Sequence, residues 1–139
     1  MKKVTGIGGI FFKCKDPQAM RSWYAEHLGM TRAEDGEMLF EWRESDSPDK
    51  KAYTAFCLFK ENTDYFNPSA KDYMFNFRVE NLEALLEELK KQGVQVIGEI
   101  QTFEYGKFGW ITDPEGNKIE LWEPVDSVFA SMYEGQTVH

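Results

Sequence analysis

Apolar and polar positions follow the same order twice along the chain. Residues 6–14 read as an apolar strand that leads into a stretch with helical spacing, and residues 73–79 lead into a second such stretch. Each helical stretch begins after a residue that caps helices and ends at a glycine that suits a left-handed C-cap. These pairs are Asp16 with Gly29 and Asn81 with Gly93. The pattern therefore predicts two copies of one strand–helix unit.

Three further strands are expected after each helix. In the first copy they cover residues 30–33, 38–43 and 52–59, and in the second copy they cover 94–97, 108–112 and 118–123. Two such units favour an α+β fold in which two βαβββ modules place their sheets side by side, with the helices outside and a concave cup inside. Residues 1–124 then form one domain, with module one at 4–60, a linker at 61–72, module two at 73–124 and a C-terminal tail at 125–139.

Alternation along the strands separates the residues that pack on a helix from those that face the cup. In residues 73–79, Phe75, Phe77 and Val79 form the apolar side that should pack on a helix. The opposite side of this strand, together with the matching sides of the first and last strands, should face the cup. The residues expected there are Gly9, Phe11, Lys13, Met74, Asn76, Arg78, Glu120 and Trp122.

Composition and charge narrow the range of partners. The 139 residues carry a net charge of -8, and no basic stripe is present that could displace counterions from nucleic acid or bind an anionic membrane surface. No apolar run approaches the length of a membrane span, so we expect a cytoplasmic protein. Aromatic residues make up 15% of the chain, which is high and suits a core, a pocket or an interface.

Three segments carry a resemblance to a known superfamily. They are residues 8–29, residues 77–82 and, above all, residues 108–124 with the turn Asp113-Pro114-Glu115-Gly116-Asn117. They resemble the vicinal oxygen chelate superfamily, which includes glyoxalases, extradiol dioxygenases and bleomycin resistance proteins. The resemblance covers nearly the whole chain before the tail and implies the two-module fold, a small-molecule ligand and a homodimer. Because this superfamily hosts many chemistries on one scaffold, it does not specify a reaction.

In the metal-using members of this superfamily, the ligands sit at four corners of the cup. The matching positions here are Gly9, Met74, Glu120 and a fourth within residues 54–57, which the repeat spacing does not fix and for which we take Cys57. A non-haem iron oxygenase needs two histidines and a carboxylate, and the chain holds only His27 and His139. The resemblance therefore implies a degenerate metal site, with no cofactor expected and a divalent metal disfavoured.

Aromatic residues with a few polar neighbours could line a small-molecule pocket in the cup, or they could pack in the core and at an interface. Lys13 and Arg78 occupy equivalent positions, where they could bind an anionic ligand or lie solvated at the rim. The uncharged pocket candidates are Phe11, Trp42, Met74, Asn76, Phe103, Tyr105, Phe108, Trp110 and Trp122.

Glu120 is the strongest candidate for catalysis. In an apolar cup its pKa should rise, which suits a general base, whereas on a solvated sheet face it would only pair with Lys13 or Arg78. Two hypotheses follow. In the first, the protein binds a small, largely apolar or aromatic molecule without a metal. In the second, it is a lyase, isomerase or epimerase in which Glu120 is the general base or a residual metal ligand and Tyr105 or Asn76 polarises a carbonyl.

Overall fold

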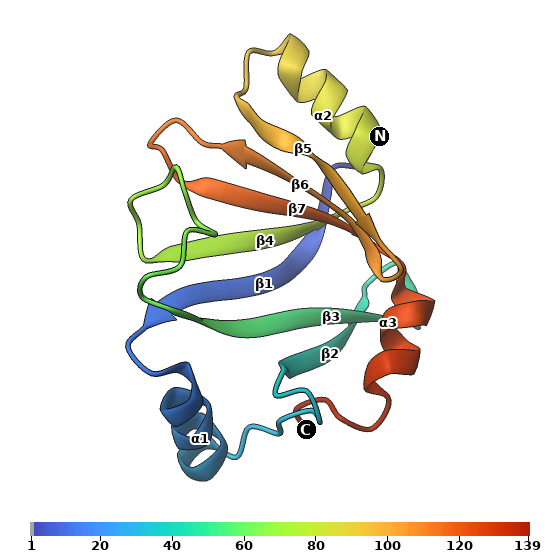
Figure 1. Ribbon diagram of the computed structural model, residues 1–139. Coiled ribbons are helices and arrows are strands. Elements are labelled where there is room, and N and C mark those ends of the chain that lie inside the picture. The colour runs from blue at the N-terminus through green and yellow to red at the C-terminus, as the bar shows by residue number, and fades with distance from the viewer. Residues whose placement is uncertain (1) are drawn as a thin grey trace.

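The computed structural model describes residues 2–139 as one curved sheet with three helices (Figure 1). The strands are β1 (Val4–Cys14), β2 (Met38–Glu44), β3 (Ser47–Lys60), β4 (Tyr73–Val79), β5 (Val96–Phe103), β6 (Gly106–Thr112) and β7 (Lys118–Pro124). The helices are α1 (Pro17–Leu28), α2 (Leu82–Lys91) and α3 (Asp126–Tyr133). The seven strands lie in the order β2-β3-β1-β4-β7-β6-β5. The α+β class is therefore confirmed.

The two modules meet where β1 pairs with β4 in antiparallel fashion, and on either side β1 pairs with β3 and β4 with β7 in parallel. Both predicted caps form, because the side chains of Asp16 and Asn81 accept hydrogen bonds from backbone N–H groups of the first helical turn. Helix α2 packs on the outer side of module two through its leucine stripe. No helix within residues 2–139 has the length and apolar character needed to cross a bilayer.

Module one departs from the predicted strand pattern. The strand expected at residues 30–33 does not form, so β1, β2 and β3 make a three-stranded half opposite a four-stranded one. Instead, the N–H of Ala33 donates to the carbonyl of Glu37 and closes a turn. The free edge of β2 is covered by the C-terminal tail, where the N–H of Val138 donates to the carbonyl of Leu39 at 2.8 Å. Because an exposed edge favours pairing, the tail replaces the missing strand locally.

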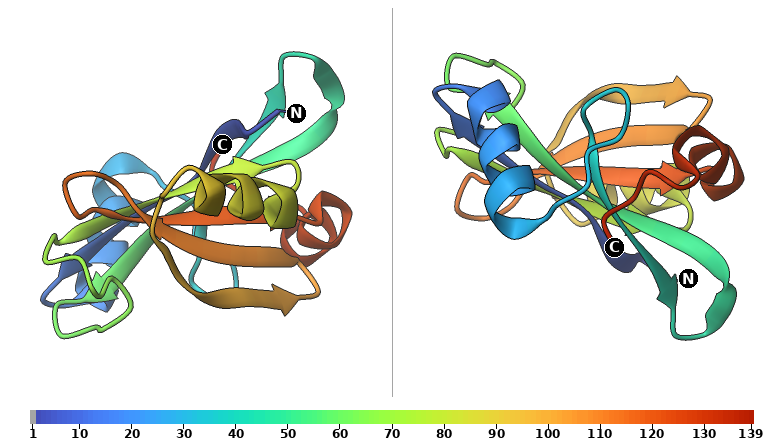
Figure 2. Two further views of the ribbon diagram at one scale, coloured as in Figure 1. Left: turned by 90° about the horizontal axis from the view of Figure 1, so that it is seen from above. Right: turned by 90° about the horizontal axis from the view of Figure 1, so that it is seen from below.

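The tail also forms α3, which packs against the inner side of the sheet. Phe129 and Tyr133 of α3 join a buried cluster that includes Trp122. Helices α1 and α3 lie at opposite ends of the sheet (Figure 2). Helix α3 therefore encloses one end of the cup. Its residues belong to the tail at 125–139, to which the sequence pattern assigned no structure.

A buried arginine ties the start of α3 to β4. The guanidinium of Arg78 lies 5.4 Å from the ring centroids of both Trp42 and Trp122. One of its nitrogens donates to the carboxylate of Asp126 at 2.7 Å. Arg78 is only 2% exposed, so this carboxylate supplies the counter-charge that a buried guanidinium requires. The pair fixes where α3 begins.

Candidate functional site

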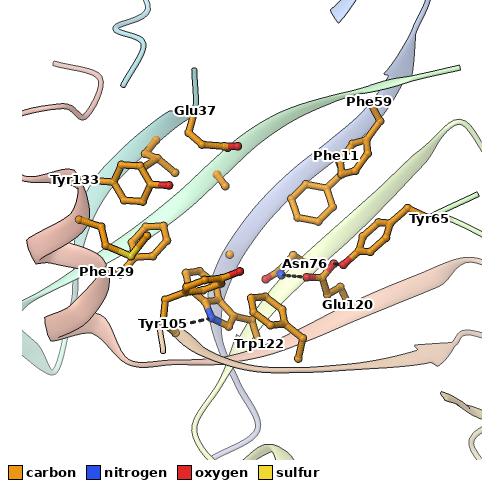
Figure 3. Close-up of a pocket in the computed structure, with 15 residues that line it drawn as sticks. Phe11, Glu37, Phe59, Tyr65, Asn76, Tyr105, Glu120, Trp122, Phe129 and Tyr133 are labelled. Carbon is orange, nitrogen blue, oxygen red and sulfur yellow. Dashed lines mark hydrogen bonds between the residues drawn. The ribbon is translucent and has the colours of Figure 1, made fainter. Parts of the chain in front are cut away.

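A cavity of about 380 Å³ lies on the concave side of the sheet, next to α3 (Figure 3). Its size is at the lower end of the range for small-molecule sites. Eight of the side chains that line it are aromatic: Phe11, Phe59, Tyr65, Tyr105, Phe108, Trp122, Phe129 and Tyr133. The remaining lining residues are Gly8, Glu37, Leu39, Ala55, Asn76, Glu120 and Met132. Both modules, the linker and the C-terminal helix thus contribute to one pocket.

The polar centre of the cavity is Glu120 on β7. The parallel register places Asn76 of β4 directly beside it, and the amide nitrogen Nδ2 donates to Glu120 Oε1 at 3.2 Å. From the linker, the hydroxyl of Tyr65 donates to Glu120 Oε2 at 2.9 Å. Each carboxylate oxygen therefore accepts one hydrogen bond inside the pocket, with Glu120 itself 2% exposed.

Burial raises the pKa of Glu120 to about 7, because the charged form loses its hydration. The hydrogen bonds from Tyr65 and Asn76 oppose this rise, since they stabilise the carboxylate. The pKa of Tyr65 is itself raised by burial and by the neighbouring carboxylate. A carboxyl group with this pKa can gain or lose a proton near neutral pH, which is the property that a general acid or base needs.

A second carboxyl group, Glu37, faces the cavity from the loop before β2. Burial, together with the nearby charge of Asp35, raises its pKa. The thiol of Cys57 donates to Glu37 Oε2 at 3.6 Å, and burial raises the pKa of this thiol well above its usual value. Sequence reasoning missed Glu37. Glu37 lies two residues before Leu39, so alternation along a strand would place both side chains on the side that faces the pocket. Met38 between them is apolar and buried as well, so the sequence shows no clear alternation of apolar and polar residues there.

Helix α3 supplies three lining residues that sequence reasoning also missed. Phe129, Met132 and Tyr133 have the i, i+3, i+4 spacing of one helical face, which could have identified them. The hydroxyl of Tyr133 donates to Asp35 Oδ2 at 2.7 Å and so holds the helix against the loop that carries Glu37. This wall of the cavity is therefore built by the loop before β2 and by α3, which lie far apart in the sequence.

The structure places six of the predicted site residues in the cavity lining. They are Phe11, Asn76, Tyr105, Phe108, Glu120 and Trp122. Tyr105 lies in the turn between β5 and β6, and the other five lie on strands, where they face the inner side of the sheet. Whether these residues bind a ligand stays a prediction.

The other predicted residues do not line this cavity. The ammonium of Lys13 lies over the ring of Phe66, and the guanidinium of Arg78 lies behind Trp122 and pairs with Asp126. The indole N–H of Trp42 donates to the hydroxyl of Thr54. Met74 and Trp110 lie in a buried cluster, and Phe103 is exposed. The expected anion-binding pair therefore does not face the pocket, because the cavity occupies only the middle of the inner face.

Glycine at the first corner is required by a close contact. The register of β1 shifts between Ile7 and Gly9, so Gly8 lines the cavity where Gly9 was expected. A Cβ at Gly8 would lie 2.2 Å from Asn76 Oδ1, which no side chain could tolerate without moving that amide. A larger residue at this corner is therefore incompatible with the hydrogen bond between Asn76 and Glu120.

The residues at the four corners do not fit a divalent metal. Glycine offers no donor, Met74 is buried in an aromatic cluster, and Cys57 pairs with Glu37. Within residues 2–139, no three histidine, cysteine, aspartate or glutamate side chains are grouped as metal ligands. Since a stable catalytic centre needs at least three protein ligands, this donor set supports no chemistry through a metal.

The family model described as the Glyoxalase/Bleomycin resistance protein/Dioxygenase superfamily matches residues 6–121. No curated protein matches the sequence. Among solved structures, methylmalonyl-CoA epimerase from Mycobacterium tuberculosis is similar with 23% identity and a TM-score of 0.58, covering 94% of this chain and 95% of its own.

Two further solved structures resemble the chain. The Streptomyces coelicolor methylmalonyl-CoA epimerase in complex with 2-nitronate-propionyl-CoA has 17% identity and a TM-score of 0.63 over 88% of this chain and 99% of its own. A superfamily member from Vibrio splendidus has 13% identity and a TM-score of 0.52, with the same coverage of 88% and 99%. These similarities show a shared fold.

Replacing Glu120 with glutamine should change how stability depends on pH. In the folded protein the pKa is raised from 4.5 to about 7, so the folded state keeps this proton in a range where the unfolded chain has lost it. The contribution of this group to stability is thus fully present below the unfolded pKa and is lost as pH rises through about 7. The free energy of unfolding of Glu120→Gln, taken relative to that of the wild type, should therefore increase by about 2–3 kcal/mol as the pH is raised from 4.5 to 8.

Urea denaturation at several pH values, followed by circular dichroism, measures this difference directly. Glu115→Gln is a matched control, because Glu115 is exposed in the turn before β7 and loses the same charge. Parallel pH profiles for the wild type and Glu120→Gln would contradict the raised pKa.

Proposed function

The chain belongs to the Glyoxalase/Bleomycin resistance protein/Dioxygenase superfamily, and from this premise we propose that it binds a small, largely apolar or aromatic molecule in its cup without a divalent metal. The observation that carries this proposal is the cavity of about 380 Å³ with eight aromatic side chains in its lining. Aromatic walls with a few polar groups are the usual composition of a small-molecule site.

The size of the cavity and its polar groups support a compact ligand with one polar end. Burial of apolar ligand surface against rings such as Phe108, Trp122 and Phe129 supplies most of the binding free energy. Asn76 and Glu120 form the polar centre and would orient the ligand. The proposal that no metal takes part is supported by the corner residues, which offer too few donors.

A second function is favoured by one observation, the pKa of about 7 at Glu120. We propose as the alternative a lyase, isomerase or epimerase in which Glu120 transfers a proton. Glu37 lies across the cavity and offers a second carboxyl group, as proton exchange on two faces of one carbon requires (Figure 3). Asn76 donates one of its two Nδ2–H groups to Glu120, so either its second N–H or the hydroxyl of Tyr105 is the candidate donor to a substrate carbonyl.

Indole, a neutral aromatic probe, should bind in the cavity with a Kd of about 1 mM. Ala55→Phe should abolish this binding, because Ala55 lines the cavity and the added ring would occupy it. Isothermal titration calorimetry measures the affinity. The same titration in EDTA, or with added Ni²⁺, Zn²⁺, Fe²⁺ or Mn²⁺, should give the same Kd.

Ala84→Phe provides the matched control, because Ala84 is exposed on α2 and the change adds the same ring far from the cavity. Binding of indole that Ala55→Phe leaves intact would contradict the proposed site. A large rise in melting temperature on adding any of the four metals would contradict binding without a metal.

The enzyme alternative predicts a different response at Glu120. If a substrate is identified by screening compounds with an acidic C–H beside a carbonyl, Glu120→Gln should lower kcat by about 100-fold or more, because the base is removed. Calorimetry should show that the variant still binds the substrate. Turnover that persists in Glu120→Gln would exclude this residue as the base and would contradict the alternative in the form proposed.

We also propose that the protein is a homodimer that pairs through the outer side of β1 and β4. Ile10 and Phe75 lie opposite each other there, and both are about 40% exposed (39% and 43%). Ile7 and Tyr73 on the same two strands are exposed as well, and α1 buries none of its residues within the single chain. A continuous apolar face of this kind favours a two-fold contact with a second copy.

Phe75→Lys should convert the dimer to a monomer, because it places a charge at the centre of this face. Size-exclusion chromatography with light scattering measures the mass. Phe103→Lys is the matched control, since Phe103 is similarly exposed at the far end of β5. A monomeric wild-type protein, or a Phe75→Lys variant that remains dimeric, would contradict this interface.

A further inference from the structure

The charges around the cavity all have one sign. Glu37 and Glu120 line it from opposite sides, and no lysine, arginine or histidine among residues 2–139 lines it (Figure 3). The cations that act on these carboxyl groups lie outside the lining. Lys118, near Glu120, donates to the carbonyl of Tyr65 at 2.7 Å, and Arg21, near Glu37, donates to the carbonyl of Leu58 at 3.4 Å. Burial raises the pKa of both glutamates, and the charges of Lys118 and Arg21 offset this rise only in part.

The aromatic walls favour a positive charge as well. Each ring carries partial negative charge on its face, so a cation placed against it is attracted, and the attraction grows when water is excluded. Eight such side chains surround the cavity, from both modules, the linker and α3. Tyr105, Phe108 and Trp122 lie on one side, where Phe108 and Trp122 are stacked at 5.7 Å. An anionic ligand would face repulsion from these ring faces and from the two glutamates.

An unpaired acceptor specifies the kind of cation. Asn76 is 2% exposed, and its Oδ1 has no hydrogen-bond partner, whereas its Nδ2 donates to Glu120. Oδ1 lies beside Gly8, which lines the cavity. A buried oxygen of this kind gains from an N–H or O–H donor on the ligand. A protonated amine supplies that donor and the positive charge together.

We propose that the ligand of the cup is a protonated organic amine on an aromatic or apolar body, with its ammonium group against Asn76 Oδ1 and Glu120 and its body among the rings. This inference rests on the proposed binding function and names the chemical class of the ligand. Glu37, on the opposite side, adds attraction at longer range. A metal cation is not the occupant, because no suitable set of ligands is grouped within residues 2–139.

A matched series of three indoles tests the charge of the ligand. Tryptamine is a cation at pH 7, tryptophol is its neutral alcohol, and indole-3-propionate carries a carboxylate. By isothermal titration calorimetry, tryptamine should bind about tenfold more tightly than tryptophol, and indole-3-propionate should bind more weakly than either. Ala55→Phe should abolish binding of tryptamine and tryptophol alike.

Charge variants then locate the ammonium. Glu120→Gln should weaken tryptamine binding about tenfold while it changes tryptophol binding less than about twofold, and Glu37→Gln should have a smaller effect in the same direction. Glu115→Gln, which removes the same charge from an exposed turn, should change neither.

The outcomes separate this inference from the binding function itself. Tryptophol binding that equals or exceeds tryptamine binding, and that Ala55→Phe abolishes, would overturn the amine proposal and leave the pocket intact. Equal loss of tryptamine binding in Glu115→Gln and Glu120→Gln would also overturn it, because the attraction would then come from net charge alone. If none of the three compounds shows binding that Ala55→Phe removes, both proposals fail.

Discussion

The pairing of β1 with β4, and of β4 with β7, fixes the side chains that face the cavity. The antiparallel contact joins the two modules, and the parallel contact places Asn76 beside Glu120. Side chains on one strand alternate between faces, so each pairing decides which residues share the inner side. A shift of one residue between β4 and β7 would place Glu120 on the outer side and remove the polar centre of the pocket.

The inner side combines features that oppose each other energetically. Aromatic walls exclude water, which raises the free energy of ionised Glu120 and Glu37. Hydrogen bonds from Tyr65 and Asn76 return part of that stabilisation to Glu120. Arg78 shows the opposite solution, because its charge is matched by Asp126 within the chain. The buried charge at the start of α3 thus has a counter-charge within the chain. The carboxyl groups in the cavity have none among the lining residues, so a ligand can supply it.

Sequence patterns predicted the parts of the fold that follow regular alternation. Helix caps at Asp16 and Asn81, and the inner side of β4 and β7, could be read because glycine, capping and apolar residues occur at fixed offsets. The same approach failed for residues 30–33, where four residues with few apolar side chains were expected to pair at an edge. That edge is instead covered by Val138, which lies almost a hundred positions after Leu39 and Phe40, a contact that no local pattern can reveal.

The candidate site was predicted in part for the same reason. Phe11, Asn76 and Glu120 lie on regular strands near the middle of the sheet, so their direction followed from alternation. Lys13 and Arg78 had been assigned to the same side, yet they lie beyond the limits of the cavity, which depend on packing rather than on periodicity. Glu37 and the residues of α3 enter through loops and long-range contacts, so their role in the pocket required the three-dimensional structure.

The contact between Val138 and the edge of β2 has a consequence for folding during synthesis. During synthesis the segments that form β1, α1, β2 and β3 emerge from the ribosome first. The backbone that covers the edge of β2 emerges only later, with residues 126–138. Until then the nascent first module exposes an open edge and an incomplete hydrophobic wall, which is where a chaperone or a neighbouring nascent chain can bind. Cup formation therefore follows translation of both modules and cannot proceed one module at a time.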